Sequence, residues 1–198
     1  SNLGRADDGS YYETENYAIT ESHEPGSTFK LVDLIAVLDD KKADTSKIYD
    51  SKGGVIEYYG RKVRDSKPGG YGKISLARGF ELSSNTVLVQ SVYDSYKNNP
   101  KQFVDRINSY GLNKPLGLPI KGEGKPVIPQ PGTNRWSGVA LPWMAFGYGL
   151  SVTPLQTLTL YNAVANDGVM VKPIFVSEIK EWNKTIKKYN TEVINPKI

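Results

Sequence analysis

The run from Phe29 to Leu38 limits what this chain can fold into more than any other stretch. Nearly every side chain in it is apolar, on all sides of a 3.6-residue helix. Such a helix belongs in the middle of a domain, so we expect it to be the central buried helix. Pro25-Gly26 cannot continue a helix from upstream, and the helix should therefore begin near Ser27. That start places the Ser27 hydroxyl at the positive end of the helix dipole.

Lys30 places an amine inside this apolar run. Because helical side chains three residues apart share a face and lean toward the N-terminus, Lys30 should point at Ser27. A lysine can activate a serine when its pKa is depressed, and burial and the helix N-terminus both depress it. However, Ser-x-x-Lys is a weak signal, and a second copy runs from Ser177 to Lys180 without the apolar helix or the Pro-Gly start. Taken alone, Ser27 and Lys30 favour a polar helix N-terminus with a snorkelling lysine over a catalytic pair.

The composition excludes several kinds of chemistry. The 198 residues contain no cysteine, which excludes thiol catalysis, iron–sulfur clusters and Cys-based zinc sites. The single histidine, His23, is predicted to lie in a loop, and one histidine cannot build a His-based metal cluster. The net charge of +4 is only mildly basic, so we expect no nucleic-acid partner. No apolar run reaches the roughly 18 residues that cross a bilayer, and no signal peptide is present.

Beyond the buried helix, the pattern predicts further helices separated by turns and short strands. Residues 48–73 alternate between apolar and polar side chains and are broken by glycines, which is typical of short strands or hairpins. Thr153-Pro154-Leu155-Gln156 reads as a capping box that opens a helix ending near Asn166. Other helices are expected over 74–82, over 86–96 and from Pro100 toward Gly111, with an irregular start over 1–22, a long loop over 112–137, a strand over 169–176 and a solvated basic tail.

Three separate stretches resemble one known family. Glu24-Pro25-Gly26-Ser27-Thr28-Phe29-Lys30, Ser83-Ser84-Asn85 and Gly147-Tyr148-Gly149-Leu150-Ser151-Val152-Thr153-Pro154-Leu155-Gln156 are similar to the transpeptidase domain of class B penicillin-binding proteins. These are the division-type and elongation-type D,D-transpeptidases of peptidoglycan synthesis. The resemblance is specific because three unrelated patterns occur in the family's order across most of the chain. It outweighs the interpretation of Ser27 and Lys30 as an ordinary helix start.

The resemblance implies a role for each matching residue. Ser27 would be the nucleophile that attacks the penultimate D-Ala carbonyl of a stem peptide and forms an acyl-enzyme, and Lys30 would take its proton. Ser83 would relay a proton toward the leaving group, and Asn85 would bind the substrate amide. A β-lactam antibiotic would acylate Ser27 in the same way and leave slowly. No metal or organic cofactor is implied.

The resemblance also implies a cellular setting. The expected partners are peptidoglycan stem peptides, β-lactam antibiotics and other cell-wall synthesis proteins. The expected location is the extracytoplasmic face of the bacterial cytoplasmic membrane, with the anchor outside this chain.

The family's third motif, Lys-Ser/Thr-Gly, is missing: no lysine of the chain is followed by Ser/Thr-Gly. The first two sheet strands of the family should also precede Ser27, and most of the length they need is absent. We therefore expect residues 1–198 to be a partial transpeptidase domain, mainly α: the helical portion of the α+β penicillin-binding transpeptidase and β-lactamase-like fold, with much of the antiparallel sheet missing. Since the third motif supplies one oxyanion-hole donor, the chain alone should be weakly active or inactive.

Three alternatives stay open. A β-lactamase or D,D-carboxypeptidase on the same fold would use the same Ser-x-x-Lys and Ser-x-Asn, although the segment Thr153–Gln156 favours a transpeptidase. A non-catalytic β-lactam sensor or scaffold module would bind at Ser27 without turnover. A soluble helical interaction domain would carry the motifs by chance.

Overall fold

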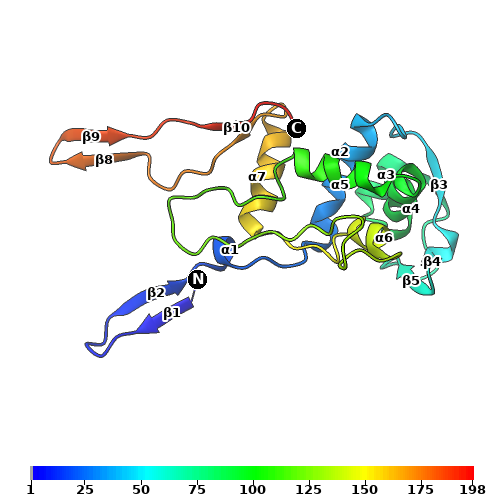
Figure 1. Ribbon diagram of the computed structural model, residues 1–198, viewed down its shortest axis with the longest axis horizontal. Coiled ribbons are helices and arrows are strands. Elements are labelled where there is room, and N and C mark those ends of the chain that lie inside the picture. Colours follow the sequence, from blue (N-terminus) through cyan, green and yellow to red (C-terminus); the bar gives the residue numbers. More distant parts are fainter. Residues whose placement is uncertain (1) are drawn as a thin grey trace. The chain divides into compact units, whose positions relative to one another are not determined.

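The computed structural model describes residues 2–198 and divides into two compact units (Figure 1). Unit 1 contains the residues up to 22 together with 109–126 and 152–198, and unit 2 contains 23–108 and 127–151. Ser27, Lys30, Ser83 and Asn85 all belong to unit 2. Within residues 2–198, no helix has the length and hydropathy of a membrane span.

A buried helix forms the centre of unit 2, which confirms the prediction made from the apolar run. Helix α2, Lys30–Asp39, is entered through the short 3-10 turn η1, Gly26–Phe29. Its Val32, Ala36 and Val37 side chains are buried. The longer helix α4, Asn85–Tyr96, packs against α2, and its Tyr96 hydroxyl donates to the Ala36 carbonyl at 2.8 Å. The second half of α2 is therefore held inside the unit by α4.

The rest of unit 2 consists of short helices and two strand pairs. A two-residue turn, Tyr59-Gly60, joins strands β4 (Val55–Tyr58) and β5 (Arg61–Arg64). Both turn residues have the left-handed backbone that tight hairpins require. This hairpin leads the chain to Asp65, beside the start of α4. The helices are α3 (Leu76–Glu81), α5 (Pro100–Ser109) and α6 (Ala140–Met144), and the strands are β3 (Ile48–Asp50), β4 (Val55–Tyr58), β5 (Arg61–Arg64) and β6 (Lys73–Ser75).

Unit 1 is built on α7, Pro154–Ala165, which begins with the predicted capping box. Thr153 Oγ1 accepts from the Gln156 backbone N–H at 3.2 Å, and Gln156 Oε1 accepts from the Thr153 N–H at 2.9 Å. The remaining elements of unit 1 are α1 (Tyr17–Thr20), β1 (Asn2–Arg5), β2 (Tyr11–Glu15), β7 (Met170–Val171), β8 (Glu178–Glu181), β9 (Lys184–Lys188) and β10 (Val193–Asn195).

The expectation of a mainly α chain is wrong. Of the structure, 34% is helical and 20% is strand, and the strands pair two by two as β1–β2, β3–β6, β4–β5, β7–β10 and β8–β9. Residues 1–22 were expected to be irregular, yet β1 and β2 form a hairpin there. The basic tail is solvated as expected, and it forms the hairpin β8–β9. The side chains of β8 and β9 are exposed throughout, so these strands lack the alternation of buried and exposed residues that reveals a strand in a sequence. The sheet is nevertheless incomplete in this chain.

Candidate active site

Ser27 and Lys30 lie where η1 becomes α2. Lys30 Nζ is 3.1 Å from Ser27 Oγ. The Ser27 residue is exposed, whereas Lys30 is only 1% exposed. The turn therefore presents the hydroxyl to solvent and keeps the amine behind it.

The loop before α4 brings Ser83 to the same amine, and the first residue of α4, Asn85, reaches it as well. Lys30 Nζ donates to the Ser83 carbonyl and to Asn85 Oδ1, each at 2.6 Å, and lies 3.0 Å from Ser83 Oγ. Ser83 has a left-handed φ of 53°, a conformation that is uncommon for residues other than glycine and is often found at functional sites. The structure thus brings together all four residues singled out in the sequence, while their roles in a reaction stay a prediction.

The hydrogen-bond partners of Lys30 suit a neutral amine. The Ser83 carbonyl and Asn85 Oδ1 are acceptors only, so they take two N–H donors. A neutral amine has two N–H groups, and its lone pair is then left for a serine hydroxyl. Ser27 Oγ and Ser83 Oγ are both at hydrogen-bond distance from Nζ. A proton can therefore pass from either hydroxyl to this nitrogen.

The electrostatics of Lys30 keep the ammonium as the major form at pH 7 and make the neutral amine accessible. Burial lowers its pKa to about 8, and electrostatic interactions with Asp33 and Asp65 oppose that shift. With a pKa near 8, about one tenth of the amine is unprotonated at pH 7. A base with a pKa close to the working pH is the kind that general base catalysis needs.

Asp33 is a buried acid that the sequence analysis overlooked. It lies one helical turn beyond Lys30 and is 0% exposed, and neither of its carboxylate oxygens has a hydrogen-bond partner within the described residues. Burial raises the pKa of Asp33 well above its usual range, and the charge of Lys30 only partly offsets this. The available signal was a second charged residue in the apolar run, three positions after the first.

Two residues at the end of β5 hold the loop of Ser83 and Asn85, and the sequence analysis missed them as well. Asn85 Nδ2 donates to the Arg64 carbonyl at 2.7 Å. Asp65 Oδ1 accepts from Ser84 Oγ at 3.0 Å and from the Thr86 N–H at 2.9 Å. These contacts join segments about twenty residues apart, so no local pattern in the sequence predicts them.

The segment from Gly147 to Gly149 holds the chain that leads into the turn of Ser27. The Gly26 N–H donates to the Gly147 carbonyl at 3.0 Å, and the Gly149 N–H donates to Glu24 Oε1 at 2.8 Å. Gly147 has a φ of 84°, and a Cβ there would lie 2.0 Å from the Gly26 carbonyl oxygen. Only glycine permits this approach of two backbones. The contact gives a structural reason for a glycine at this place in the third matching stretch.

Metal ligands do not gather in the part of the chain that the structure describes. No group of three or more His, Cys, Asp or Glu side chains there could hold a metal ion.

Comparison with known proteins identifies the family. Residues 3–198 match the penicillin-binding protein transpeptidase domain. Among curated relatives, the penicillin-binding protein PbpB of Mycobacterium tuberculosis is 31% identical over 80% of this chain and 22% of its own length. The peptidoglycan D,D-transpeptidase FtsI of Escherichia coli is 28% identical over 83% of this chain and 26% of its own length.

A solved structure agrees with the sequence comparison. Penicillin-binding protein 3 of M. tuberculosis, in complex with aztreonam, superposes with a TM-score of 0.76 at 26% identity. The match covers 92% of this chain and 40% of that protein. The chain spans about a quarter of the length of the curated relatives it matches. From the match over residues 3–198, this chain belongs to the penicillin-binding protein transpeptidase family.

Proposed function

We propose that this chain carries the acylation centre of a peptidoglycan D,D-transpeptidase, with Ser27 as nucleophile and Lys30 as its base. The observation that carries the proposal is the buried Lys30 amine, which is 3.1 Å from Ser27 Oγ and is held by Ser83 and Asn85. A relative of this chain is named a peptidoglycan D,D-transpeptidase, and a related structure holds the β-lactam aztreonam.

The first chemical step follows from the contacts. The Ser27 hydroxyl loses its proton to Lys30 Nζ while Oγ attacks the penultimate D-Ala carbonyl of a stem peptide. Ser83 Oγ, 3.0 Å from the same nitrogen, then carries the proton toward the departing D-Ala amine. Asn85 holds the ammonium through Oδ1 and is placed to bind the substrate amide. The acyl group stays on Ser27 until an acceptor amine takes it.

A β-lactam presents a carbonyl comparable to that of the D-Ala-D-Ala end and should acylate Ser27 by the same step. Peptidoglycan lies outside the cytoplasm, and we place the site there, on the outer face of the cytoplasmic membrane. Other cell-wall synthesis proteins are the expected partners of a protein that carries this domain.

Mass spectrometry of the chain incubated with benzylpenicillin tests the proposal. We expect a slow covalent adduct on Ser27 that is absent from Ser27→Ala. The chain contains no Lys-Ser/Thr-Gly, and the loss of one oxyanion-hole donor costs about 10²–10³ in rate. An extended version that includes this motif should therefore react correspondingly faster. If neither version gains an adduct on Ser27, the proposed function is wrong; rapid stoichiometric labelling of the present chain would refute the expected weak activity.

The lifetime of the adduct separates a transpeptidase from a β-lactamase. A persistent acyl-enzyme in the extended version supports the transpeptidase, whereas release within seconds indicates a hydrolase. Transfer of the acyl group to an amine acceptor, measured with a stem-peptide substrate, excludes a sensor that binds without turnover.

A further inference from the structure

A carboxylate outside the predicted motifs holds the first turn of α4. Asp65, immediately after β5, accepts from Ser84 Oγ and the Thr86 N–H through Oδ1, and from Thr86 Oγ1 through Oδ2 at 2.8 Å. Three donors from Ser84 and Thr86, the two residues that flank Asn85, therefore converge on one side chain. Hydrogen bonds to a charged acceptor are about twice as strong as neutral ones.

The same turn carries Asn85, whose two amide atoms connect β5 to the buried amine. Asn85 Nδ2 donates to the Arg64 carbonyl, and Oδ1 accepts from Lys30 Nζ. The neighbours of Asn85 on both sides are tied to Asp65, so a shift of this turn would move Oδ1 away from Nζ. The end of β5 thus fixes a residue that touches Lys30.

We propose that Asp65 is a positioning residue for this site: its carboxylate fixes the first turn of α4 so that Asn85 meets Lys30. The inference rests on the proposed function, because that function makes the amine of Lys30 the base. Asp65 itself does not touch the reacting atoms in this arrangement; it acts through Asn85 and through its charge.

The charges around Lys30 support this role. Two carboxyl groups act on its pKa, Asp33 on its own helix and Asp65 beyond β5, and both raise it against the effect of burial. The loop before α4 presents only the neutral groups of Ser83 and Asn85 to Nζ. Removal of the Asp65 charge should therefore lower the pKa of Lys30, whereas mere unfolding of the turn would expose Lys30 to water and raise it.

Nuclear magnetic resonance of the chain with Asp65→Asn tests the proposal without any acylation. The pKa of Lys30, read from its Cε resonance and assigned with Lys30→Arg, should fall below about 8, by roughly half a unit to one unit. The side-chain amide protons of Asn85 should exchange at least about tenfold faster, since a hydrogen bond to a charged group has been weakened. An unchanged or higher pKa of Lys30, or unchanged exchange at Asn85, overturns the proposal.

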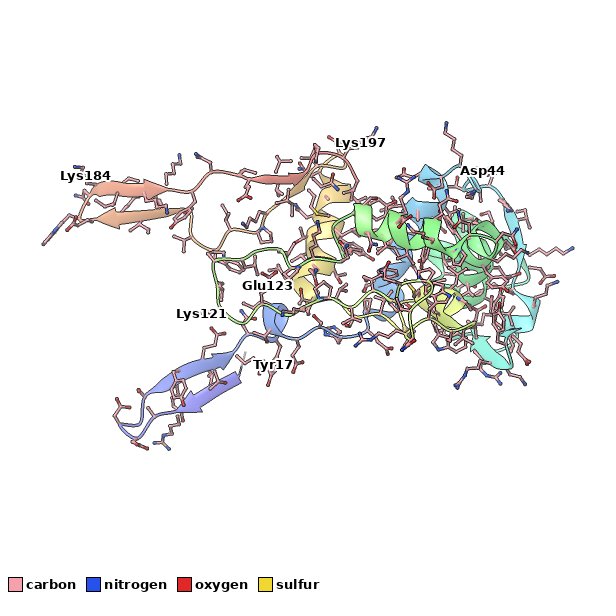
Figure 2. All side chains as sticks on the ribbon, in the orientation of Figure 1. Tyr17, Asp44, Lys121, Glu123, Lys184 and Lys197 are labelled. Atoms are coloured by element: carbon pink, nitrogen blue, oxygen red, sulfur yellow. The ribbon has the colours of Figure 1, made fainter. Side chains whose placement is uncertain are left out.

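Asp44→Asn is the matched control. Asp44, labelled in Figure 2, also accepts from a backbone N–H and a hydroxyl, both of Ser46, and its charge is not among those that act on Lys30. This variant should leave the pKa of Lys30 and the exchange at Asn85 as they are. The same substitution is thus made once beside the site and once in a surface turn.

Thr86→Val keeps the proposal open to refutation if Asp65→Asn does not fold. It removes one donor to Asp65 and keeps the charge. Exchange at Asn85 should rise severalfold while the pKa of Lys30 stays near about 8; slow exchange in this variant overturns the proposal. These readouts do not involve benzylpenicillin. The inference on Asp65 can therefore fail while Ser27 is still acylated, and the proposed function can fail while the inference on Asp65 holds.

Discussion

The two Ser-x-x-Lys copies of this chain have the same spacing and opposite surroundings. Ser27 and Lys30 lie in a turn that continues into a buried helix, and Lys30 is 1% exposed. In the second copy, Lys180 belongs to strand β8, and 52% of its side chain is exposed. Its Nζ is 2.6 Å from Glu178 Oε1 rather than beside Ser177.

Backbone geometry explains the difference. Three residues along a helix return a side chain to the same face, whereas three residues along a strand turn it to the opposite face. In β8 the partner of Lys180 is two residues away, as the strand period requires. Figure 2 shows the side chains of this hairpin, including the labelled Lys184, pointing outward. The spacing of the motif therefore has chemical meaning only where the chain is helical.

The largest expected effect is an all-or-none difference between the two serines. Ser27→Ala should abolish the benzylpenicillin adduct in the extended version that carries Lys-Ser/Thr-Gly. The reason is that Ser27 has a lysine amine at hydrogen-bond distance, whereas the lysine of the second copy pairs with Glu178. Ser177→Ala should leave the adduct yield unchanged. Intact-mass measurement of both variants gives the answer, and an adduct that survives in Ser27→Ala would contradict the assignment.

The backbone contact between Gly147 and Gly26, which holds the turn of Ser27, should be the next most sensitive to substitution. Gly147→Ala places a Cβ 2.0 Å from the Gly26 carbonyl oxygen, a clash between two backbones that no side-chain rotation relieves. We expect a loss of at least about 3 kcal/mol in the free energy of unfolding, measured by urea denaturation.

Gly132→Ala is the control for backbone strain alone. Gly132 also has a left-handed φ, of 86°, but a Cβ there meets nothing within 4 Å. Its cost should be about 1 kcal/mol. Equal losses of unfolding free energy in Gly147→Ala and Gly132→Ala would show that the contact with Gly26 adds nothing to the cost of backbone strain.

The pH dependence of acylation should report Lys30. Because the unprotonated amine is the base and burial lowers its pKa to about 8, the rate of adduct formation should rise about tenfold per pH unit below that value and level off above it. Ser27→Ala provides the background from alkaline hydrolysis of the antibiotic. A flat profile between pH 6 and 9 would remove Lys30 from the role of base.

Local patterns predicted those parts of both units in which the interactions are short in sequence. The buried helix, the capping box at Thr153 and the Ser27–Lys30 contact all depend on residues a few positions apart. The meeting of Ser83 and Asn85 with Lys30 could be proposed only from the resemblance to a family. The contact of Asp65 with the start of α4 depends on how a hairpin folds back, and no residue pattern encodes that distance.

The errors in the fold have the same origin. Hairpins such as β8–β9 are exposed on both faces, so their sequence lacks the alternation that marks a half-buried strand. Asp33 was passed over because a helix described as apolar all round was assumed to have one charged exception. A search for charged residues at helical spacing from Lys30 would have found it.

The smallest effect separates the carboxylates that accompany the two lysines. Since burial raises the folded-state pKa of Asp33 above its unfolded value, its contribution to stability is full below about pH 4 and is lost as the pH rises toward the folded pKa. Asp33→Asn removes this titration and should be more stable than the unmodified chain at pH 7, by about 1–2 kcal/mol. Glu178→Gln, in the exposed pair with Lys180, should change the free energy of unfolding by less than about 0.5 kcal/mol at any pH. Urea denaturation at pH 4 and pH 7 decides: a gain for Asp33→Asn that is the same at both pH values would mean that Asp33 is not held protonated by its burial.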